Sequence, residues 1–290
     1  TKNIYEINGQ DIFQNIPERI VMLENIRFYN QEEKNDYEFA SYLAKLADIY
    51  VNDAFSCSHR AHASIASVTN FLPSYSGLQF ELEVNALEKI TSDIKKPITC
   101  IIGGSKISTK IDIIKNLIPK FNNIIFVGGM ANNILSFKGN GIGKSISEEN
   151  CENIIKEIFE ISKNTLCEIT YPEDVLIGKS TDDDAQIKDL KDIADDDLIL
   201  DVGPKTLKRI KNIIENSKTV LWNGPAGYFE NPNFANGSFE IAKTIIKKNK
   251  DNSIYSVVGG GDTVAVVNQL NAIKDFNFVS TAGGAFLEYL

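Results

Sequence analysis

A run of three glycines, Gly259 to Gly261, stands directly before Asp262 and Thr263. It separates an apolar, strand-like run, SVV, from an apolar, helix-like run, VAVVNQL. Because glycine carries a backbone-entropy cost, a run of them needs a compensating role. One such role is to let a phosphate approach bare N–H groups at a helix start, where the helix dipole favours anions. The alternative is a tight turn in which Asp262 caps the helix.

Two lysines, Lys106 and Lys110, lie four residues apart in GGSKISTK. That spacing predicts that both side chains leave one face of a helix's first turns. Like charges near the positive end of a helix are mildly destabilising, and an anion would reverse that effect. The alternative is a pair of ordinary surface lysines. Asp262 would repel a phosphate directly, so beside one it fits a ligand of Mg²⁺ that the phosphates also coordinate, or else a helix cap.

The segment WNGPAGYFE carries two further polar candidates. Asn223 could hydrogen-bond a phosphate or another polar edge, and Glu230 could accept from a pair of sugar hydroxyls. For Trp222 we expect packing in the core.

Basic residues gather in NDAFSCSHRAH, which holds His59, Arg60 and His62. The two histidines have HxxH spacing, but no third metal ligand lies nearby in the sequence, so an anion-binding patch is the favoured interpretation. Arg27, in LENIRFYN, follows a strand-like run and could join this patch.

The elements that must position these residues repeat from residue 94 onward. An apolar, β-branched run is followed by glycines and then by a helical pattern. The runs are ITCIIGG, NIIFVGG, LILDVGP, TVLWNGPAG and SVVGGGD. Near-continuous Val/Ile strands predict a buried parallel sheet, and every glycine turn then lies at the carboxyl edge, where ligands bind. This convergence favours the ligand-binding interpretation of the glycine run.

The first part of the chain predicts strands at ERIVMLENIRF and ADIYVNDAF around a helix at NDYEFASYLAKLA. A long, breaker-poor helical pattern, GLQFELEVNALEKITSDI, follows and could connect two domains. The acidic run TDDDAQIKDLKDIADDD predicts a solvated loop and short helix. GNGIGKS resembles a phosphate-binding loop, but Lys138 stands where that motif needs glycine, so we expect a surface turn.

Composition limits the classes of function. The chain has 290 residues, 43% apolar and 24% charged, which is typical of about two globular domains. A net charge of -9 argues against broad nucleic-acid binding. The apolar runs are too short to span a membrane, and no signal peptide is visible. The four cysteines lack CxxC pairing, which favours a reducing, cytoplasmic location.

Taken together, these segments resemble the phosphoglycerate kinase family. The resemblance follows the family's order through LENIRFYN, YVNDAFSCSHRAHAS, IIGGSKISTK, FVGGMA, LDVGPKT, LWNGPAGYFE, VVGGGDT and VSTAGGAFLE. It implies an α/β fold with two Rossmann-like, parallel-sheet domains joined by a long helix. It also implies phosphoryl transfer between 1,3-bisphosphoglycerate and Mg-ADP, with a hinge that closes the cleft.

The resemblance also implies a role for each candidate residue. Arg27 and Arg60 would bind 3-phosphoglycerate, with His59 and His62 in the same basic patch. Lys106 would stabilise the phosphoryl group in transit, Lys110 would hold nucleotide phosphates, and Asp262 would hold Mg²⁺. The remaining nucleotide contacts would come from Gly128, Gly129, Asn223, Glu230 and the stretch Gly259, Gly260, Gly261, Asp262 and Thr263. Backbone N–H groups of Gly260 and of Gly283-Gly284 would surround the transferring group, so the glycine run would clear space for a phosphate.

The resemblance divides the chain at the following residues: 1–79, a partial 3-phosphoglycerate domain; 80–93, the interdomain helix; 94–279, the nucleotide domain; and 280–290, the hinge and return. The family's Asp-x-Asn and His-x-x-Arg motifs and a further arginine, expected before Thr1, are absent here. We therefore expect an incomplete N-terminal domain and little turnover by this chain alone. We expect a monomer with small-molecule substrates. The alternative function is a nucleotide-binding module without catalysis.

Overall fold

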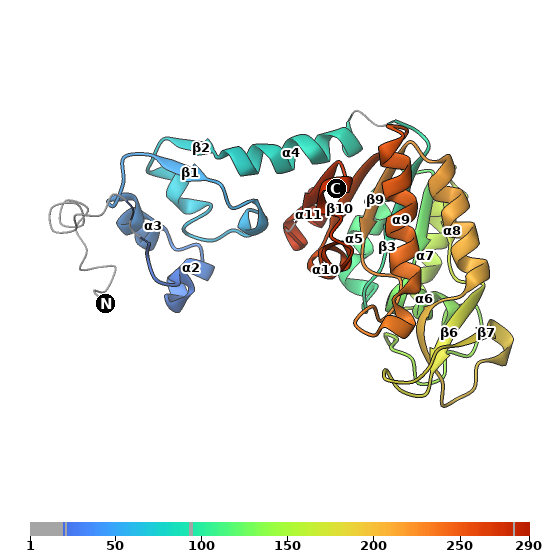
Figure 1. Cartoon of the computed structure of the whole chain (residues 1–290). Helices are drawn as coiled ribbons and strands as arrows, with labels where there is room; N and C mark the ends of the chain where they lie inside the picture. Colours follow the sequence, from blue (N-terminus) through green and yellow to red (C-terminus); the bar gives the residue numbers. More distant parts are fainter. Residues whose placement is uncertain (1–19, 21, 93–94, 281) are drawn as a thin grey trace. The chain divides into compact units, whose positions relative to one another are not determined.

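The computed structural model describes residues 20, 22–92, 95–280 and 282–290. The chain forms two compact units, one comprising Thr1–Asn85 with Tyr289 and the other Ala86–Glu288 with Leu290 (Figure 1). Each unit is built around its own buried residues, and each is described by itself below.

The larger unit is built on a parallel sheet. Its six strands, counted over the described residues, follow the order β11-β10-β9-β3-β4-β5. The strands are β3 (Ile98–Ile102), β4 (Asn123–Phe126), β5 (Glu168–Thr170), β9 (Thr219–Asn223), β10 (Tyr255–Gly259) and β11 (Phe278–Ser280). Every residue of β3 and β9 is buried, which explains their almost unbroken apolar sequences. The prediction of a buried parallel sheet is confirmed for β3, β4, β9 and β10.

Helices cover both faces of this sheet. They are α5 (Ile111–Leu117), α6 (Gly128–Phe137), α7 (Glu152–Lys163), α8 (Pro204–Asn216), α9 (Asn236–Lys250), α10 (Gly261–Gln269) and α11 (Gly284–Glu288). Helices α8 and α9 pack side by side over a core that includes Trp222 (Figure 1). From β3 the chain moves along the sheet to β4, whereas from β9 it moves the other way to β10. Since parallel crossovers are right-handed, the helices α5, α6 and α7 lie on the face of the sheet opposite to α8 and α9.

The direction of the chain reverses between two neighbouring strands, β3 and β9. After β3 the chain continues to β4, and after β9 it continues to β10 on the other side. In open α/β sheets a crevice forms at such a switch point, outside the carboxyl ends of the strands. Here Gly103 directly follows β3 and Gly224 directly follows β9, and a Cβ on Gly224 would lie 2.5 Å from Gly103 Cα. Glycine is therefore needed where these loops meet.

A separate antiparallel sheet extends the larger unit and corrects two predictions. Its strands, β6 (Asp174–Gly178), β7 (Gln186–Asp189) and β8 (Leu198–Val202), pair in the order β7-β6-β8 in the part of the chain described. The run LILDVGP was predicted in the parallel sheet, but it forms β8. An apolar run does not specify its pairing partner, so the pattern alone was ambiguous.

The prediction for the acidic run is the second one corrected, and only in part: the run does contain a short helical turn, but it also contains a strand. Part of it forms β7, followed by the 3₁₀ turn Leu190–Asp192. Its last residue, Asp197, is fully buried and is held by ion pairs to Lys179 and Lys188 at 2.8 and 2.6 Å. Pairing with β6 makes part of the run a strand, and the ion pairs with the two lysines allow Asp197 to be buried, although acidic residues usually favour exposed loops.

The smaller unit contains α2 (Asn30–Glu33), α3 (Tyr37–Ala44), β1 (Tyr50–Asn52), β2 (Ser74–Ser76) and the first part of α4 (Leu78–Thr91). Strands β1 and β2 are parallel, and a small core forms around Phe39, Ala40 and Ala63. The helix predicted within residues 35–47, the strand at ADIYVNDAF and the long helical pattern are confirmed as α3, β1 and α4.

The strand predicted at ERIVMLENIRF is wrong where the structure describes it. Met22–Asn25 have no regular structure, and Ile26–Phe28 form a 3₁₀ turn. Glu18, Arg19 and Val21 lie outside the described residues. A strand needs a hydrogen-bonded neighbour, and in the described part of this unit the strand pairing joins β1 to β2.

Candidate functional site

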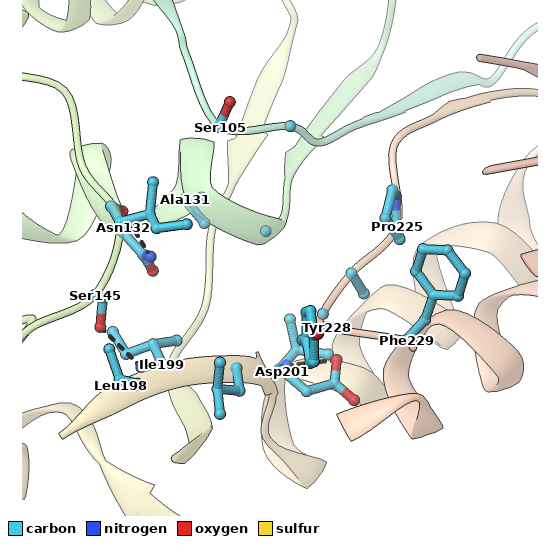
Figure 2. Close-up of a pocket in the computed structure, with 18 of the residues that line it drawn as sticks. Ser105, Ala131, Asn132, Ser145, Leu198, Ile199, Asp201, Pro225, Tyr228 and Phe229 are labelled. Carbon is cyan, nitrogen blue, oxygen red and sulfur yellow. Dashed lines mark hydrogen bonds between the residues drawn. The ribbon is translucent and has the colours of Figure 1, made fainter. Parts of the chain in front are cut away.

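A cavity of about 520 Å³ lies in the larger unit, beside the switch point between β3 and β9. Gly128 and Gly129 at the start of α6, strand β8 and the loop from Pro225 to Glu230 line it. In Figure 2, Asn132 and Ser145 lie on one side of the cavity, and Pro225, Tyr228 and Phe229 lie on the other. This volume is within the range of small-molecule sites.

The start of α6 forms one wall of the cavity, and its first two residues, Gly128 and Gly129, have no side chains. Gly128 has a φ of +60°, and a Cβ on Gly129 would lie 3.1 Å from both Gly104 O and Ser105 Cα. The helix therefore packs directly under the loop that follows β3. A planar group could lie flat against this wall.

Lys110 joins the ends of two strands. Its Nζ donates to Gly103 O and to Asn223 Oδ1, both at 2.8 Å. Asn223 Nδ2 in turn donates to Gly259 O at 2.8 Å, so the ends of β3, β9 and β10 are linked. Burial lowers the pKa of Lys110, whereas the nearby Asp262 carboxylate favours its charged form. Asn223 thus uses both its side-chain oxygen and its side-chain nitrogen to link the strand ends that form the site.

Lys106 does not share a helix face with Lys110, contrary to the prediction from their spacing. Ser108–Lys110 form a 3₁₀ turn, α5 begins at Ile111, and Lys106 lies in the exposed loop before them. The loop is fixed by Glu148, whose carboxylate accepts hydrogen bonds from Ser108 N at 3.0 Å and from Ser108 Oγ. These bonds lower the pKa of Glu148. Sequence reasoning missed Glu148, because a contact across 40 residues has no local signal.

The three glycines before Asp262 have three different environments. A Cβ on Gly259 would lie 2.4 Å from the Phe286 ring, and one on Gly260, whose φ is +93°, would lie 2.8 Å from Asn223 Nδ2. A Cβ on Gly261 would meet nothing within 4 Å. Packing and backbone conformation therefore account for the first two glycines, and open space surrounds only the third.

Asp262 lines the cavity from the first turn of α10. The alternative prediction, that it caps this helix, is wrong, because the N-cap is Gly260 and no side chain caps the helix. Thr263 is buried, and its Oγ1 accepts from Gly224 N at 2.7 Å, so it supports the turn after β9. Trp222 is in the core as expected, with Nε1 donating to Gly224 O at 2.8 Å.

Of the remaining nucleotide candidates, Glu230 is exposed and lines the cavity. Gly283, with a φ of +53°, precedes α11. Over the residues that the structure describes, no group of three or more His, Cys, Asp or Glu side chains could hold a metal ion by itself.

The smaller unit brings three of its four basic candidates into one segment after β1. Arg60 Nε donates to His59 Nε2 at 3.4 Å, and His62 Nδ1 lies 3.7 Å from Glu32 Oε1. Glu32 is buried and also accepts from Ser64 N and Ser64 Oγ, at 2.9 and 2.5 Å. Arg27 is exposed on the 3₁₀ turn Ile26–Phe28.

Several cavity residues were not predicted from the sequence. They are Asn132, Ser145, Tyr228 and the β8 residues Leu198, Ile199, Leu200, Asp201 and Val202. The turn expected at 139–145 is present, but it ends in Ser145, which is buried rather than on the surface. Asp201 accepts from Val202 N at 2.8 Å and from Gly237 N at 2.7 Å, and burial raises its pKa to about 7. A largely apolar cavity lined by Asp262, with Lys110 near that carboxylate, suits a ligand with a flat apolar part and an anionic part.

Comparison with known proteins gives a consistent result. A family model described as Phosphoglycerate kinase matches residues 4–290. The phosphoglycerate kinase of Wolbachia pipientis subsp. Culex pipiens (strain wPip) is 47% identical over 273 residues, which cover 93% of this chain and 69% of that protein. The phosphoglycerate kinase of Caulobacter vibrioides (strain NA1000 / CB15N) is 44% identical over 273 residues, with 93% and 69% covered.

Solved structures of phosphoglycerate kinases are similar as well. The structure from Coxiella burnetii superposes with a TM-score of 0.83 at 36% identity, covering 91% of this chain and 68% of that one. The structure from Pyrococcus horikoshii OT3 has a TM-score of 0.77 at 26% identity, with 97% and 72% covered. In the described residues, no helix has the length and apolar character needed to cross a membrane.

Proposed function

This chain belongs to the phosphoglycerate kinase family, and from that premise we propose that the cavity beside β3 and β9 binds ADP or ATP for phosphoryl transfer. The family consists of glycolytic kinases, phosphotransferases that exchange a phosphoryl group between 1,3-bisphosphoglycerate and ADP. The observation that carries the proposal is the position of a glycine-walled cavity at the topological switch point.

The lining of the cavity suits the two parts of a nucleotide. Asp262 lines the cavity, interacts with Lys110 and follows Gly261, beside which there is open space. Apolar residues, including Ile146, Leu198 and Ile199, line it as well. We therefore place the phosphates beside α10 and the base between α6 and β8. Glu230 would accept from the ribose hydroxyls.

Phosphoryl transfer depends on positioning and on neutralising charge, and it needs no covalent nucleophile. In the described structure the ammonium group of Lys106 makes no hydrogen bond or ion pair, so it is free to meet the transferring group. Lys110 would contact the nucleotide phosphates while it remains bonded to Asn223. Backbone N–H groups of Gly260 and Gly261 and of Gly283-Gly284 would supply further donors.

Magnesium fits this donor set. Mg²⁺ is usually held by one or two carboxylates together with substrate phosphates, and Asp262 supplies an exposed carboxylate on the cavity wall. When bound, the ion would offset the charge of the phosphates.

The smaller unit is proposed to bind 3-phosphoglycerate. Arg60, His59 and His62 lie within one short segment, and Arg27 is exposed on a 3₁₀ turn of the same unit. Such a group of side chains suits a ligand that carries a carboxylate and a phosphate. We also propose a monomer in the cytoplasm that does not bind nucleic acid. The four free cysteines support the cytoplasmic location, and the net charge of -9 argues against nucleic-acid binding.

A coupled assay of ATP formation from 1,3-bisphosphoglycerate and Mg-ADP tests this function. We expect this chain alone to form ATP only slowly; slow formation of ATP that Lys106→Ala abolishes would support the function and exclude a contaminating kinase. Calorimetry with Mg-ADP, read together with this assay, distinguishes the kinase from the alternative function. A nucleotide-binding module without catalysis would bind Mg-ADP and transfer no phosphoryl group. Absence of nucleotide binding would contradict both.

A further inference from the structure

The turn between Lys106 and Lys110 is not capped by its own sequence. Ser108–Lys110 form a 3₁₀ turn that leads directly into α5, and neither element receives a hydrogen bond from its own N-cap side chain. Lys106 lies two residues before Ser108, and Lys110 lies two residues after it. The first N–H groups of a helical segment lack partners within it, so they need an acceptor from elsewhere. The group that holds this turn therefore determines where both lysine side chains begin.

Glu148 supplies the acceptor from a distant loop. Its Oε2 accepts from Ser108 N at 3.0 Å, and its Oε1 accepts from Ser108 Oγ. These two bonds lower the pKa of Glu148, and the Ile107 N–H and the charge of Lys106 act in the same direction. The carboxylate is therefore charged while it holds the turn, and hydrogen bonds to a charged acceptor are stronger than those to a neutral one.

Glu148 is itself anchored to the core of the larger unit. Its backbone N–H donates to Asn133 Oδ1 at 2.6 Å, and Asn133 lies on α6 with only 1% of its surface exposed. Asn133 Nδ2 donates to Gly129 O at 3.2 Å, and Cys151 Sγ donates to Glu148 O at 3.2 Å. Both backbone polar groups of Glu148 are thus bonded, so its carboxylate extends from a fixed point.

The two lysines depend on this anchor to different degrees. The Lys110 ammonium is bonded to Gly103 O and to Asn223 Oδ1, so the strand ends fix one end of the side chain and the turn fixes the other. The Lys106 ammonium has no hydrogen-bond or ion-pair partner among the described residues, so its position depends on its backbone. Phosphoryl transfer is sensitive to such placement, because a displacement of about 1 Å can reduce the rate about a hundredfold.

We propose that Glu148 is a positioning residue for the nucleotide phosphates, because it holds the turn that places Lys106 and Lys110. The inference rests on the proposed function, in which these two lysines meet the phosphates. Glu148 is close enough to Lys106 to interact with its charge, and by charge alone the carboxylate would repel a phosphate. Removing the carboxylate therefore has two opposite effects: loss of the position weakens nucleotide binding, whereas loss of the negative charge strengthens it.

Isothermal titration calorimetry of the full chain with Mg-ATP tests the proposal, because ATP carries the phosphoryl group that Lys106 would meet. Glu148→Ala should weaken Mg-ATP binding about tenfold, because it removes both bonds to Ser108. Glu148→Gln keeps a carbonyl acceptor for Ser108 N, so its affinity should lie within about threefold of that of the unsubstituted chain. Glu149→Ala removes the same charge from the next residue, which is exposed, and should not weaken binding.

A double-mutant cycle distinguishes positioning of the lysines from a general loosening of the fold. In a chain that already carries Lys106→Ala and Lys110→Ala, adding Glu148→Ala should weaken Mg-ATP binding by less than about twofold. An equal loss with and without the two lysines would show that Glu148 acts independently of them and would overturn the inference. Unchanged or tighter Mg-ATP binding by Glu148→Ala would overturn it as well, and both results leave the proposed function standing.

Ser108→Ala keeps the test valid if Glu148→Ala does not fold. It removes one of the two bonds from the other partner and leaves Ser108 N free to donate. It should weaken Mg-ATP binding about threefold in the unsubstituted chain and have almost no effect in the chain without the two lysines. Unchanged affinity in Ser108→Ala would overturn the inference. Absence of Mg-ATP binding by the unsubstituted chain would overturn the proposed function and, with it, this inference.

Discussion

At the residue scale, the polar side chains around the cavity divide into two groups. Asn223, Thr263 and Glu148 form hydrogen bonds within the loops that build the site, each with at least one backbone group. Lys106, Asp262 and Glu230 are exposed. Lys110 belongs to both groups, since it is bonded to the framework and lies near Asp262. Substitutions in the first group should disturb structure, and substitutions in the second should disturb binding.

Replacement of Lys110 should weaken nucleotide binding. Lys110→Ala removes a charge-assisted contact to a phosphate, which is worth about 1.5 to 3 kcal/mol. Calorimetry with Mg-ADP measures the loss. Lys115→Ala, on the helix α5 that follows Lys110, is the matched control, because Lys115 pairs with Glu157 at 2.6 Å and does not line the cavity. Unchanged Mg-ADP affinity in Lys110→Ala would remove this residue from the site.

Asp201 should make the stability of the protein depend on pH. Burial raises its pKa from 3.8 to about 7 despite two N–H donors, so the folded state holds this proton more tightly than the unfolded chain does. Its contribution to the free energy of unfolding is therefore most favourable below about pH 4 and is lost as the pH rises to about 7. A shift of about three pKa units corresponds to an upper limit of about 4 kcal/mol.

Urea unfolding at pH 5 and pH 7.5 measures this effect. Asp201→Asn should be less stable overall, because its NH₂ group cannot accept from the backbone N–H of Val202 or Gly237. Its stability should nevertheless fall less between the two pH values than that of the unsubstituted chain. If the free energy of unfolding had the same pH dependence in both proteins, the pKa of Asp201 would not be raised in the folded protein.

At the scale of elements, short loops at the strand ends build the site. The loops after β3 and β9 meet at Gly103 and Gly224, and Lys110 and Asn223 join them to the end of β10. Helix α5 and its preceding 3₁₀ turn have no side-chain cap of their own, so Glu148 supplies one from a distant loop. The site is thus held by contacts between elements.

The glycines of the 259–261 run should respond differently to substitution. Gly259→Ala places a methyl group 2.4 Å from the Phe286 ring, so it should destabilise the fold by about 1 to 3 kcal/mol through overpacking. Gly261→Ala enters open space in the first turn of α10 and should leave stability unchanged or raise it by up to about 1 kcal/mol. The same Gly261→Ala should reduce Mg-ADP affinity, because its methyl group occupies space proposed for a phosphate.

Thermal unfolding and calorimetry on the two variants separate these effects. Equal loss of stability in both would contradict the different environments of the two glycines. A Gly261→Ala protein with full Mg-ADP affinity would place the phosphates elsewhere.

At the scale of the whole molecule, the chain forms two units whose boundary falls within α4, between Asn85 and Ala86. The cavity, the parallel sheet and both flanking helix layers belong to the larger unit. The carboxyl-terminal residues also matter to it, because Phe286 packs against Gly259 and Leu290 O accepts from Lys120 Nζ at 3.1 Å.

Residues 86–290 alone should therefore fold and bind Mg-ADP within about threefold of the full chain. A shorter segment, 94–279, lacks Phe286 and the rest of α11, so it should be less stable than 86–290. Circular dichroism and calorimetry on both segments provide the comparison. Loss of nucleotide binding by 86–290 would show that the smaller unit contributes to this site.

The sequence by itself determined four strands of the parallel sheet, β3, β4, β9 and β10, and the glycine turns that follow them. Apolar β-branched runs followed by glycine act locally, so ITCIIGG and SVVGGGD predicted β3, β10 and their turns without knowledge of any partner. Only the tertiary structure decided that β8 pairs antiparallel in a second sheet and that Lys106 precedes its helix. It also decided that Glu148, Asp201 and Asn132 lie at the site. A strand's apolar pattern does not specify its neighbour, and the burial of a polar atom depends on residues far away in the sequence.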